Sequence, residues 1–321
     1  MPSPIGPLRS LLLGTRAVPD PLNRPHFAAP SPATAAELER VSLHLSQAID
    51  FAVRSKNNDE VIAHLAGVPE QYQGFAYEGA ATGLAVLDAL TPGGHRAADM
   101  FSGPTAKHDL TMYVGVGLSY GRVPKPLWGK AFPKHPVYRW LTLDGFGFYN
   151  AFFRTEKYVI GRHVEQRFPR WMGNPEPLRR AADQGLGRAL WFICGGSVEL
   201  LAQRISQFEP HRHGDLWNGV GIATTFAGGV EAADLKAISE LVPQFRADLA
   251  GGCAMVAKIR EKTGTPTPHT EAAVNTYCGC SIGEAAALID KALGEIPSDG
   301  SAASYQLWRQ RVGELAVAQG N

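Results

Sequence analysis

The amino-acid sequence predicts an all-α fold, and three observations lead to this expectation. Apolar residues recur at helical spacing along several segments, whereas apolar–polar alternation over five or more residues is hard to find. No Asn-Gly or Asp-Gly turn lies between β-branched runs. Glycines also come in pairs along successive apolar segments. These patterns together predict a single α/α toroid of about six helical hairpins, with glycine-rich inner helices and amphipathic outer helices.

The first 33 residues are expected to form an arm outside this domain, which would cover residues 34–321. The arm is rich in proline, which favours an extended segment that wraps the domain or is partly disordered. Thr34 followed by Glu37 fits a capping box, so the first helix of the domain is expected to begin there. Apolar stripes predict this helix and two later ones. The stripes are Leu38, Val41, Leu45 and Ala52, then Leu235, Ile238, Val242 and Phe245, then Ala285, Leu288, Ile289 and Ala292.

Six glycine pairs recur every 30 to 40 residues, which is the length of one helical hairpin. Glycine costs a helix about 1 kcal/mol relative to alanine, so the pairs indicate positions where helix backbones approach closely. A nucleotide-binding loop is the alternative, but Gly115, Gly117 and Gly121 give G-x-G-x-x-x-G with no strand before it. The pairs are Gly79 with Gly83, Gly115 with Gly117, Gly145 with Gly147, Gly185 with Gly187, Gly219 with Gly221, and Gly251 with Gly252.

The charge balance argues against a nucleic-acid partner. The chain of 321 residues has 31 Lys and Arg against 30 Asp and Glu, a net charge of +1. Its four cysteines lie in apolar surroundings, which is typical of reduced thiols and favours a cytoplasmic protein. No export signal and no membrane-spanning segment is visible, so we expect a soluble protein. Peripheral contact of an apolar cavity mouth with a membrane surface stays an alternative.

Polar and aromatic side chains gather near the glycine pairs. In a toroid they would converge on one mouth of a central cavity, which is the usual place for a ligand site. Helix capping by each acid is the alternative. The polar residues are Glu78, His108, Asp109, Asp144, Asp183, Gln184, Asp215 and Asn218. The aromatic residues are Phe75, Tyr77, Tyr113, Tyr120, Phe146, Phe148, Tyr149, Trp191, Trp217 and Phe226.

An acid among aromatic rings suits carbocation chemistry. Burial disfavours the charged form of a carboxyl group, so the group stays protonated near neutral pH and can act as a general acid. Aromatic faces stabilise a nearby cation without supplying a nucleophile to quench it. We therefore expect Asp109, Glu78 and Asp144 to be the candidate catalytic acids and the ten aromatic residues to be the candidate substrate-binding residues.

Seven sequence blocks carry a resemblance to a known family. From Gln73 to Arg311 they are GFAYEGAA, GPTAKHDLTMYVGVG, YRWLTLDGFGFYNAFF, DQGLGRALWF, HGDLWNGVGIA, HTEAAV and YQLWRQRVGEL. This run, about three quarters of the chain, resembles the bacterial domain-of-unknown-function family best known from enediyne biosynthetic clusters. That family usually reads GPG-x-x-H-V-Y-M in the second block, so His108 matches and Asp109 departs. With an Asp at this position the chain looks like the monodomain class II isoprenoid cyclases of meroterpenoid pathways, which are similar to one barrel domain of the squalene-hopene cyclases.

This resemblance implies that Asp109 donates a proton to a terminal alkene or epoxide of a prenylated substrate. The Asp-x-Asp-Asp signature of the larger cyclases is absent, so Asp109 would need another partner to orient it. The Asp-Asp-x-x-Asp magnesium motif is absent too, which favours metal-free cyclisation without a cofactor. Two sets of residues could in principle bind a metal, but neither has the spacing of established metal sites. They are His211 and His213 with Asp215, and His269 with Cys278 and Cys280.

Two functions therefore stay open. One is a metal-free cyclase for a prenyl chain, with a prenylated aromatic or related meroterpenoid precursor as the substrate. The other is a non-catalytic accessory protein that binds an apolar intermediate of an enediyne-type or other natural-product pathway. A glycosidase-like toroid is weaker, because the predicted lining has few side chains that hydrogen-bond sugars.

Overall fold

The structure, a computed structural model, describes residues 6–14, 20–29 and 31–319. These residues form helices and loops with no β-strand among them, so the predicted all-α fold class is confirmed. The α-helices are α1 (Gly6–Leu12), α2 (Pro32–Arg54), α3 (Asn58–Ala66), α4 (Glu70–Leu90), α5 (Arg96–Asp99), α6 (Asp109–Tyr120), α7 (Leu141–Phe153), α8 (Pro175–Ile193), α9 (Val198–Ser206), α10 (His213–Phe226), α11 (Ala232–Leu241), α12 (Arg246–Thr263), α13 (Pro268–Cys278), α14 (Ile282–Gly294) and α15 (Ala302–Gln319). None of these helices is long and apolar enough to cross a bilayer.

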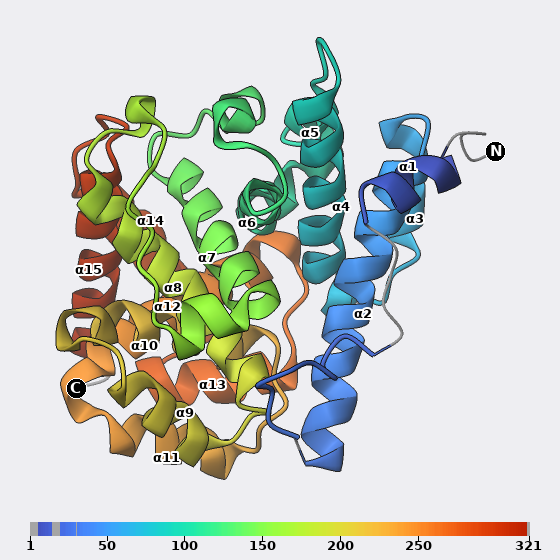
Figure 1. The fold of residues 1–321 in the computed structure, drawn as a ribbon. Coiled ribbons are helices and arrows are strands. Elements are labelled where there is room, and N and C mark those ends of the chain that lie inside the picture. Colours follow the sequence, from blue (N-terminus) through green and yellow to red (C-terminus); the bar gives the residue numbers. More distant parts are fainter. Residues whose placement is uncertain (1–5, 15–19, 30, 320–321) are drawn as a thin grey trace.

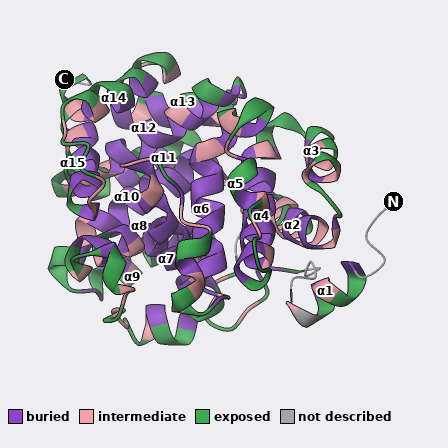
Figure 2. Cartoon of the chain, turned by 90° about the horizontal axis from the view of Figure 1, so that it is seen from above, coloured by how far each residue is buried: buried purple, intermediate pink, exposed green. Residues whose placement is uncertain are grey.

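The glycine-rich helices pack side by side in chain order, from α4 through α6, α7, α8 and α10 to α12 (Figure 1). The row curves back on itself, because Phe226 of α10 lies against Phe75 of α4 with 4.3 Å between ring centroids. Gly74 makes this contact possible, since a side chain there would overlap the Phe226 ring. Figure 2 shows buried helices in the middle and exposed segments around them. The arrangement is toroid-like, as predicted.

Four of the six glycine pairs lie where an inner helix touches an inner helix on each side. Residues two apart on a helix point about 200° apart, so one glycine of such a pair meets the preceding inner helix and the other meets the next. On α7, Gly145 faces the carbonyl of Val114 in α6, and Gly147 faces the carbonyl of Ala182 in α8. On the other side of the same α7–α8 contact, Gly185 of α8 faces the carbonyl of Asp144 in α7. An added Cβ at any of these glycines would overlap the facing oxygen. Gly79 and Gly83 instead both face carbonyls of α2, and Gly251 lies against Gly313 of α15. Helix packing, rather than nucleotide binding, therefore explains the pairs.

The start of α2 corrects the predicted capping box. The helix begins at Pro32, and the hydroxyl of Ser31 accepts the N-cap hydrogen bond from the backbone N–H of Thr34 at 3.3 Å. The Thr34 hydroxyl instead donates to the carbonyl of Gly229, and Glu37 accepts from a tyrosine of α4. The predicted cap was wrong because tertiary contacts use both side chains.

The predicted apolar stripes pack against the core as expected, except that one of the predicted helices ends earlier. On α2, Leu38, Val41 and Ala52 are buried, and the stripe that begins at Ala285 is buried along α14. The stripe that begins at Leu235 is divided, because α11 ends at Leu241 and Pro243 opens a separate turn. Proline cannot continue a helix, since it has no N–H to donate.

The described part of the predicted arm is ordered against the ring. It contains α1, and the backbone N–H of Ala28 donates to the carbonyl of Ile193 at the end of α8, at 2.8 Å. Residues 1–5, 15–19 and 30 of the arm lie outside the described residues. The arm therefore wraps the helical domain over its described length.

Candidate functional site

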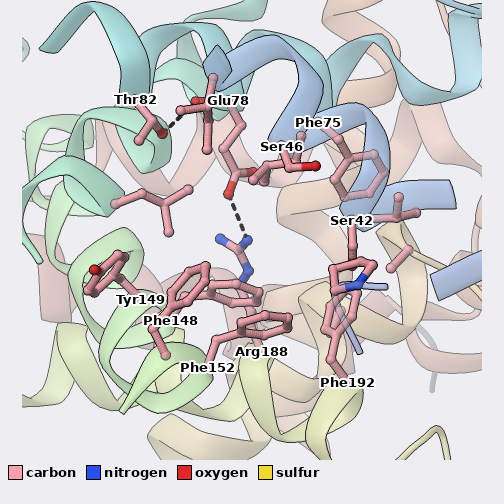
Figure 3. Close-up of a pocket in the computed structure, with 18 of the residues that line it drawn as sticks. Ser42, Ser46, Phe75, Glu78, Thr82, Phe148, Tyr149, Phe152, Arg188 and Phe192 are labelled. Atoms are coloured by element: carbon pink, nitrogen blue, oxygen red, sulfur yellow. Dashed lines mark hydrogen bonds and ion pairs between the residues drawn. The ribbon is translucent and has the colours of Figure 1, made fainter. Parts of the chain in front are cut away.

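An apolar cavity of about 400 Å³ lies inside the ring (Figure 3). Helices α4, α6, α7, α8 and α10 form its wall, α2 closes it with Val41, Leu45 and Ile49, and the N-terminal arm contributes Pro21. Seven of the lining residues are aromatic. They are Phe75, Phe148, Tyr149, Phe152, Phe153, Phe192 and Phe226. A cavity of this size and lining is typical of sites that hold small apolar ligands.

One ionic cluster enters this apolar space, and its three members come from three different helices. Arg188 of α8 donates from Nη1 to Oδ1 of Asp144 on α7 at 2.6 Å. It also donates from Nη2 to Oε1 of Glu78 on α4 at 3.3 Å, the contact that Figure 3 shows. The Arg188 guanidinium also lies over the ring of Phe148, 5.1 Å from its centroid. Glu78 and Arg188 line the cavity, whereas Asp144 is fully buried beside it.

The cluster holds two carboxyl groups and one guanidinium. Burial raises the pKa of Glu78 from its ordinary value of 4.5 to about 7, with Arg188 opposing the shift and Asp144 adding to it. Burial also raises the pKa of Asp144, against the attraction of Arg188. Because Arg188 lies nearer to Asp144, it neutralises that carboxylate first. Glu78 therefore gives up its proton at a pH of about 7, and the cluster has no net charge as long as Glu78 holds that proton.

The raised pKa of Glu78 predicts a pH dependence of stability. The pKa of the Glu78 carboxyl group is higher in the folded than in the unfolded protein. Its contribution to folding stability is therefore complete below pH 4.5 and is lost as the pH rises through 7. We expect the free energy of unfolding of the Glu78→Gln variant, relative to wild type, to rise by about 2 kcal/mol between pH 5 and pH 7. Urea unfolding at several pH values measures this difference. A difference that does not change with pH would contradict the assignment.

The other predicted acids do not reach this cavity. Each has its own basic partner from a neighbouring element, so the expectation that all of them meet at one mouth is corrected. The pairs are Asp109 with Lys262 at 2.6 Å, Asp183 with Arg212 at 2.6 Å, and Asp215 with Arg180 at 3.0 Å and Arg309 at 3.1 Å. Gln184 accepts from the Tyr305 hydroxyl, and Asn218 donates to the carbonyl of Asp248. The catalytic role that the resemblance implies for Asp109 stays a prediction.

Four of the ten predicted aromatic residues line the cavity, namely Phe75, Phe148, Tyr149 and Phe226. The other six are buried in packing contacts elsewhere in the ring. Tyr77 stacks on His108, Tyr113 lies against Phe101, Tyr120 and Phe146 pack on Trp128, Trp191 donates to the carbonyl of Gly228, and Trp217 is buried within α10.

The basic residue of the site, Arg188, was not among the predicted site residues. It is the one charged residue in the run GLGRALWF, three positions after Gly185, and a lone charge in an apolar inner helix is a usable signal. Three cavity-lining aromatic residues were not predicted either, namely Phe152, Phe153 and Phe192, which lie at the carboxyl ends of α7 and α8.

The histidines considered as metal ligands make other contacts. The ring of His213 hydrogen-bonds to the carbonyl of Phe208 at 2.8 Å, and that of His269 to the carbonyl of Thr224 at 2.5 Å. Within the described ranges, no three His, Cys, Asp or Glu side chains lie close enough together to hold a metal ion.

Comparison with known proteins identifies the family and no function. No curated protein and no solved structure matches the chain. One family model matches residues 5–315, nearly the whole chain, and it is described as a protein of unknown function, DUF1702. Its span includes the inner helices, the cavity and most of the N-terminal arm. The chain therefore belongs to the DUF1702 family.

Proposed function

We propose that this protein catalyses a metal-free, proton-initiated cyclisation of a linear prenyl chain, with Glu78 as the general acid. The observation that carries the proposal is the Glu78 carboxyl group, whose pKa is about 7, at the surface of a cavity walled by seven aromatic rings. A general acid works best when its pKa lies near the working pH, because it is then protonated and still able to give up the proton.

The reaction needs no other reagent besides water. The Glu78 proton adds to one carbon of the terminal alkene, whose π electrons form the new C–H bond and leave a tertiary cation. Internal alkenes attack that cation in turn and close the rings. The last cation loses a neighbouring C–H proton to water, and the hydronium ion so formed returns a proton to the Glu78 carboxylate, so substrate and product are isomers and the acid is regenerated. With a terminal epoxide, the proton adds to oxygen as the C–O bond breaks.

Two features of the wall fit a cationic intermediate. Aromatic faces such as those of Phe148 and Phe152 stabilise a cation by their quadrupoles. Asp144 neutralises Arg188, so the guanidinium does not oppose the positive charge that develops nearby. Glu78 takes the role that the resemblance to class II cyclases implies for Asp109, because Glu78 lines the cavity and Asp109 is paired with Lys262 outside its lining.

The resemblance to meroterpenoid cyclases supports a prenylated aromatic compound or a related precursor as the substrate. The test is incubation of the purified protein with linear farnesyl and geranylgeranyl phenols and their terminal epoxides, with EDTA present. We expect a product of unchanged mass with fewer alkene protons, detected by mass spectrometry and NMR.

The same experiment separates the cyclase from the accessory protein. If no compound is converted but prenylated phenols raise the melting temperature, the protein binds such chains without transforming them. If conversion occurs only when a divalent metal is added, metal-free protonation is wrong.

A further inference from the structure

Two further arginines line the cavity, and neither belongs to the Glu78 cluster. Arg24 comes from the N-terminal arm, and Arg122 follows the end of α6. Both are only partly buried, whereas Arg188 is buried, so they mark the side of the cavity that opens to solvent. We call Arg24 and Arg122 the mouth arginines.

Over the described ranges, the mouth arginines have no carboxylate partner, unlike three of the four buried arginines. Arg188, Arg212 and Arg309 are each paired with an Asp or Glu, and the fourth, Arg260, donates to backbone carbonyls and lies over the Phe226 ring. In the part of the chain that the structure describes, neither mouth arginine is ion-paired. Among the described residues, Arg122 donates only to the backbone carbonyls of Leu13 and Gly14, and the Arg24 side chain has no hydrogen-bond partner.

The two guanidinium groups converge on one aromatic side chain. The Cζ atom of Arg24 lies 4.9 Å from the ring centroid of Phe153, and that of Arg122 lies 5.8 Å from it. Arg24 also lies near Phe152, and Arg122 near Tyr149. Burial lowers the pKa of Arg24, as expected for a cation that loses water without gaining a carboxylate. Two positive charges therefore lie at the edge of an apolar cavity with their donors largely free.

We propose that the mouth arginines bind the anionic head group, a carboxylate or a phosphate, of the chain that enters the cavity. Guanidinium groups present donors that match the oxygens of both anions. The inference rests on the proposed function and adds the direction of binding. The charged head stays at the mouth beside Phe153, and the far end of the prenyl chain extends inward toward Glu78, where protonation begins.

A matched pair of ligands tests this inference. The probes are 4-farnesyloxybenzoic acid and its methyl ester, which share the chain and differ in the charge of the head. We expect wild type to bind the acid at least about tenfold more tightly than the ester, since hydrogen bonds from a guanidinium group to a charged oxygen are stronger than those to a neutral one. The preference should weaken at high salt. Farnesyl phosphate and farnesol make the corresponding pair for a phosphate head.

The double variant Arg24→Gln, Arg122→Gln should lose the preference for the acid over the ester. Its dissociation constant for the acid should be at least about tenfold higher than that of wild type, and its dissociation constant for the ester should stay within about twofold of the wild-type value. Arg246→Gln, an exposed arginine at the start of α12, is the matched control and should keep the preference. Because Arg122 also holds the backbone at Leu13 and Gly14, Arg24→Gln alone is measured too. It should lose part of the preference without any change in folding.

The outcomes separate this inference from the proposed function. If both ligands of a pair bind wild type equally well, or the double variant keeps the preference for the anionic one, the inference is wrong and the proposed cyclisation is unaffected. If the double variant keeps the preference but loses binding to vesicles of phosphatidylcholine with one-fifth phosphatidylserine, the arginines face a membrane and the inference is wrong. If the preference is lost as expected but no prenyl compound is cyclised, the inference holds and the proposed function fails.

Discussion

Glu78→Gln is expected to lower the rate of cyclisation at least about a hundredfold, because an amide cannot donate the proton that starts the reaction. Glutamine has the shape of glutamate, and its amide oxygen can still accept from Arg188. The variant should therefore fold and bind the prenyl substrate about as tightly as wild type. The large effect should appear in kcat and in the single-turnover rate, with little change in the dissociation constant.

The pH profile of the wild-type rate distinguishes a proton donor from a residue that only shapes the cavity. With a pKa of about 7, Glu78 is protonated below this pH, so the single-turnover rate should be constant there and fall about tenfold per unit above it. Glu78→Asp should retain some activity, because it keeps a carboxyl group. Glu199→Gln, an exposed residue of α9, serves as the control and should match wild type.

Asp109→Asn is the comparison that decides between the two candidate acids. We expect it to affect the rate far less than Glu78→Gln, since Asp109 is bound to Lys262 and does not line the cavity. If Asp109→Asn abolishes cyclisation and Glu78→Gln turns over normally, the proton comes from Asp109, as the resemblance implies, and the assignment to Glu78 is wrong.

The inner helices could be predicted from the sequence because their signal is local. Most glycine pairs report a close approach on both flanks of one helix, so positions such as Gly145 and Gly147 reveal two neighbours without knowledge of the rest of the chain. The pattern also placed Glu78 and Asp144 near one another, since each lies directly before a glycine that faces a neighbouring helix, which is α2 for Gly79 and α6 for Gly145.

The partners of the acids could not be predicted, because they come from distant parts of the chain. Lys262 lies 153 residues after Asp109, and Arg188 lies 110 residues after Glu78. Periodicity shows which residues share a helix face, but the acid that meets a given arginine depends on how the ring closes. For the same reason the proline content of the arm indicated neither helix α1 nor the position of Arg24 at the cavity.

Gly185→Ala is expected to lower the free energy of unfolding by more than about 3 kcal/mol, although alanine is the better helix former. The added methyl group would overlap the carbonyl oxygen of Asp144 and the backbone nitrogen of Phe148. These are atoms of a helix backbone, which cannot move aside as a flexible side chain can, so α7 and α8 must separate. Gly283→Ala is the control. Gly283 is exposed near the start of α14 with no atom within 4 Å of an added Cβ, and alanine there should stabilise by up to about 1 kcal/mol.

Gly185→Ala should also damage the site, because Asp144 takes part both in the close approach of α7 to α8 and in the ionic cluster. The carbonyl of Asp144 faces Gly185, and its carboxylate binds Arg188 one turn further along α8. If α7 moves away, Arg188 is freed to pair more closely with Glu78, which would lower the pKa of that carboxyl group. We therefore expect the folded Gly185→Ala variant, at a temperature well below its melting point, to lose cyclisation activity above about pH 6 and to recover part of it at lower pH. Urea unfolding and the pH profile of the single-turnover rate measure the two effects. A variant with the stability and the pH profile of wild type would contradict both predictions, the separation of α7 and α8 and its effect on the ionic cluster.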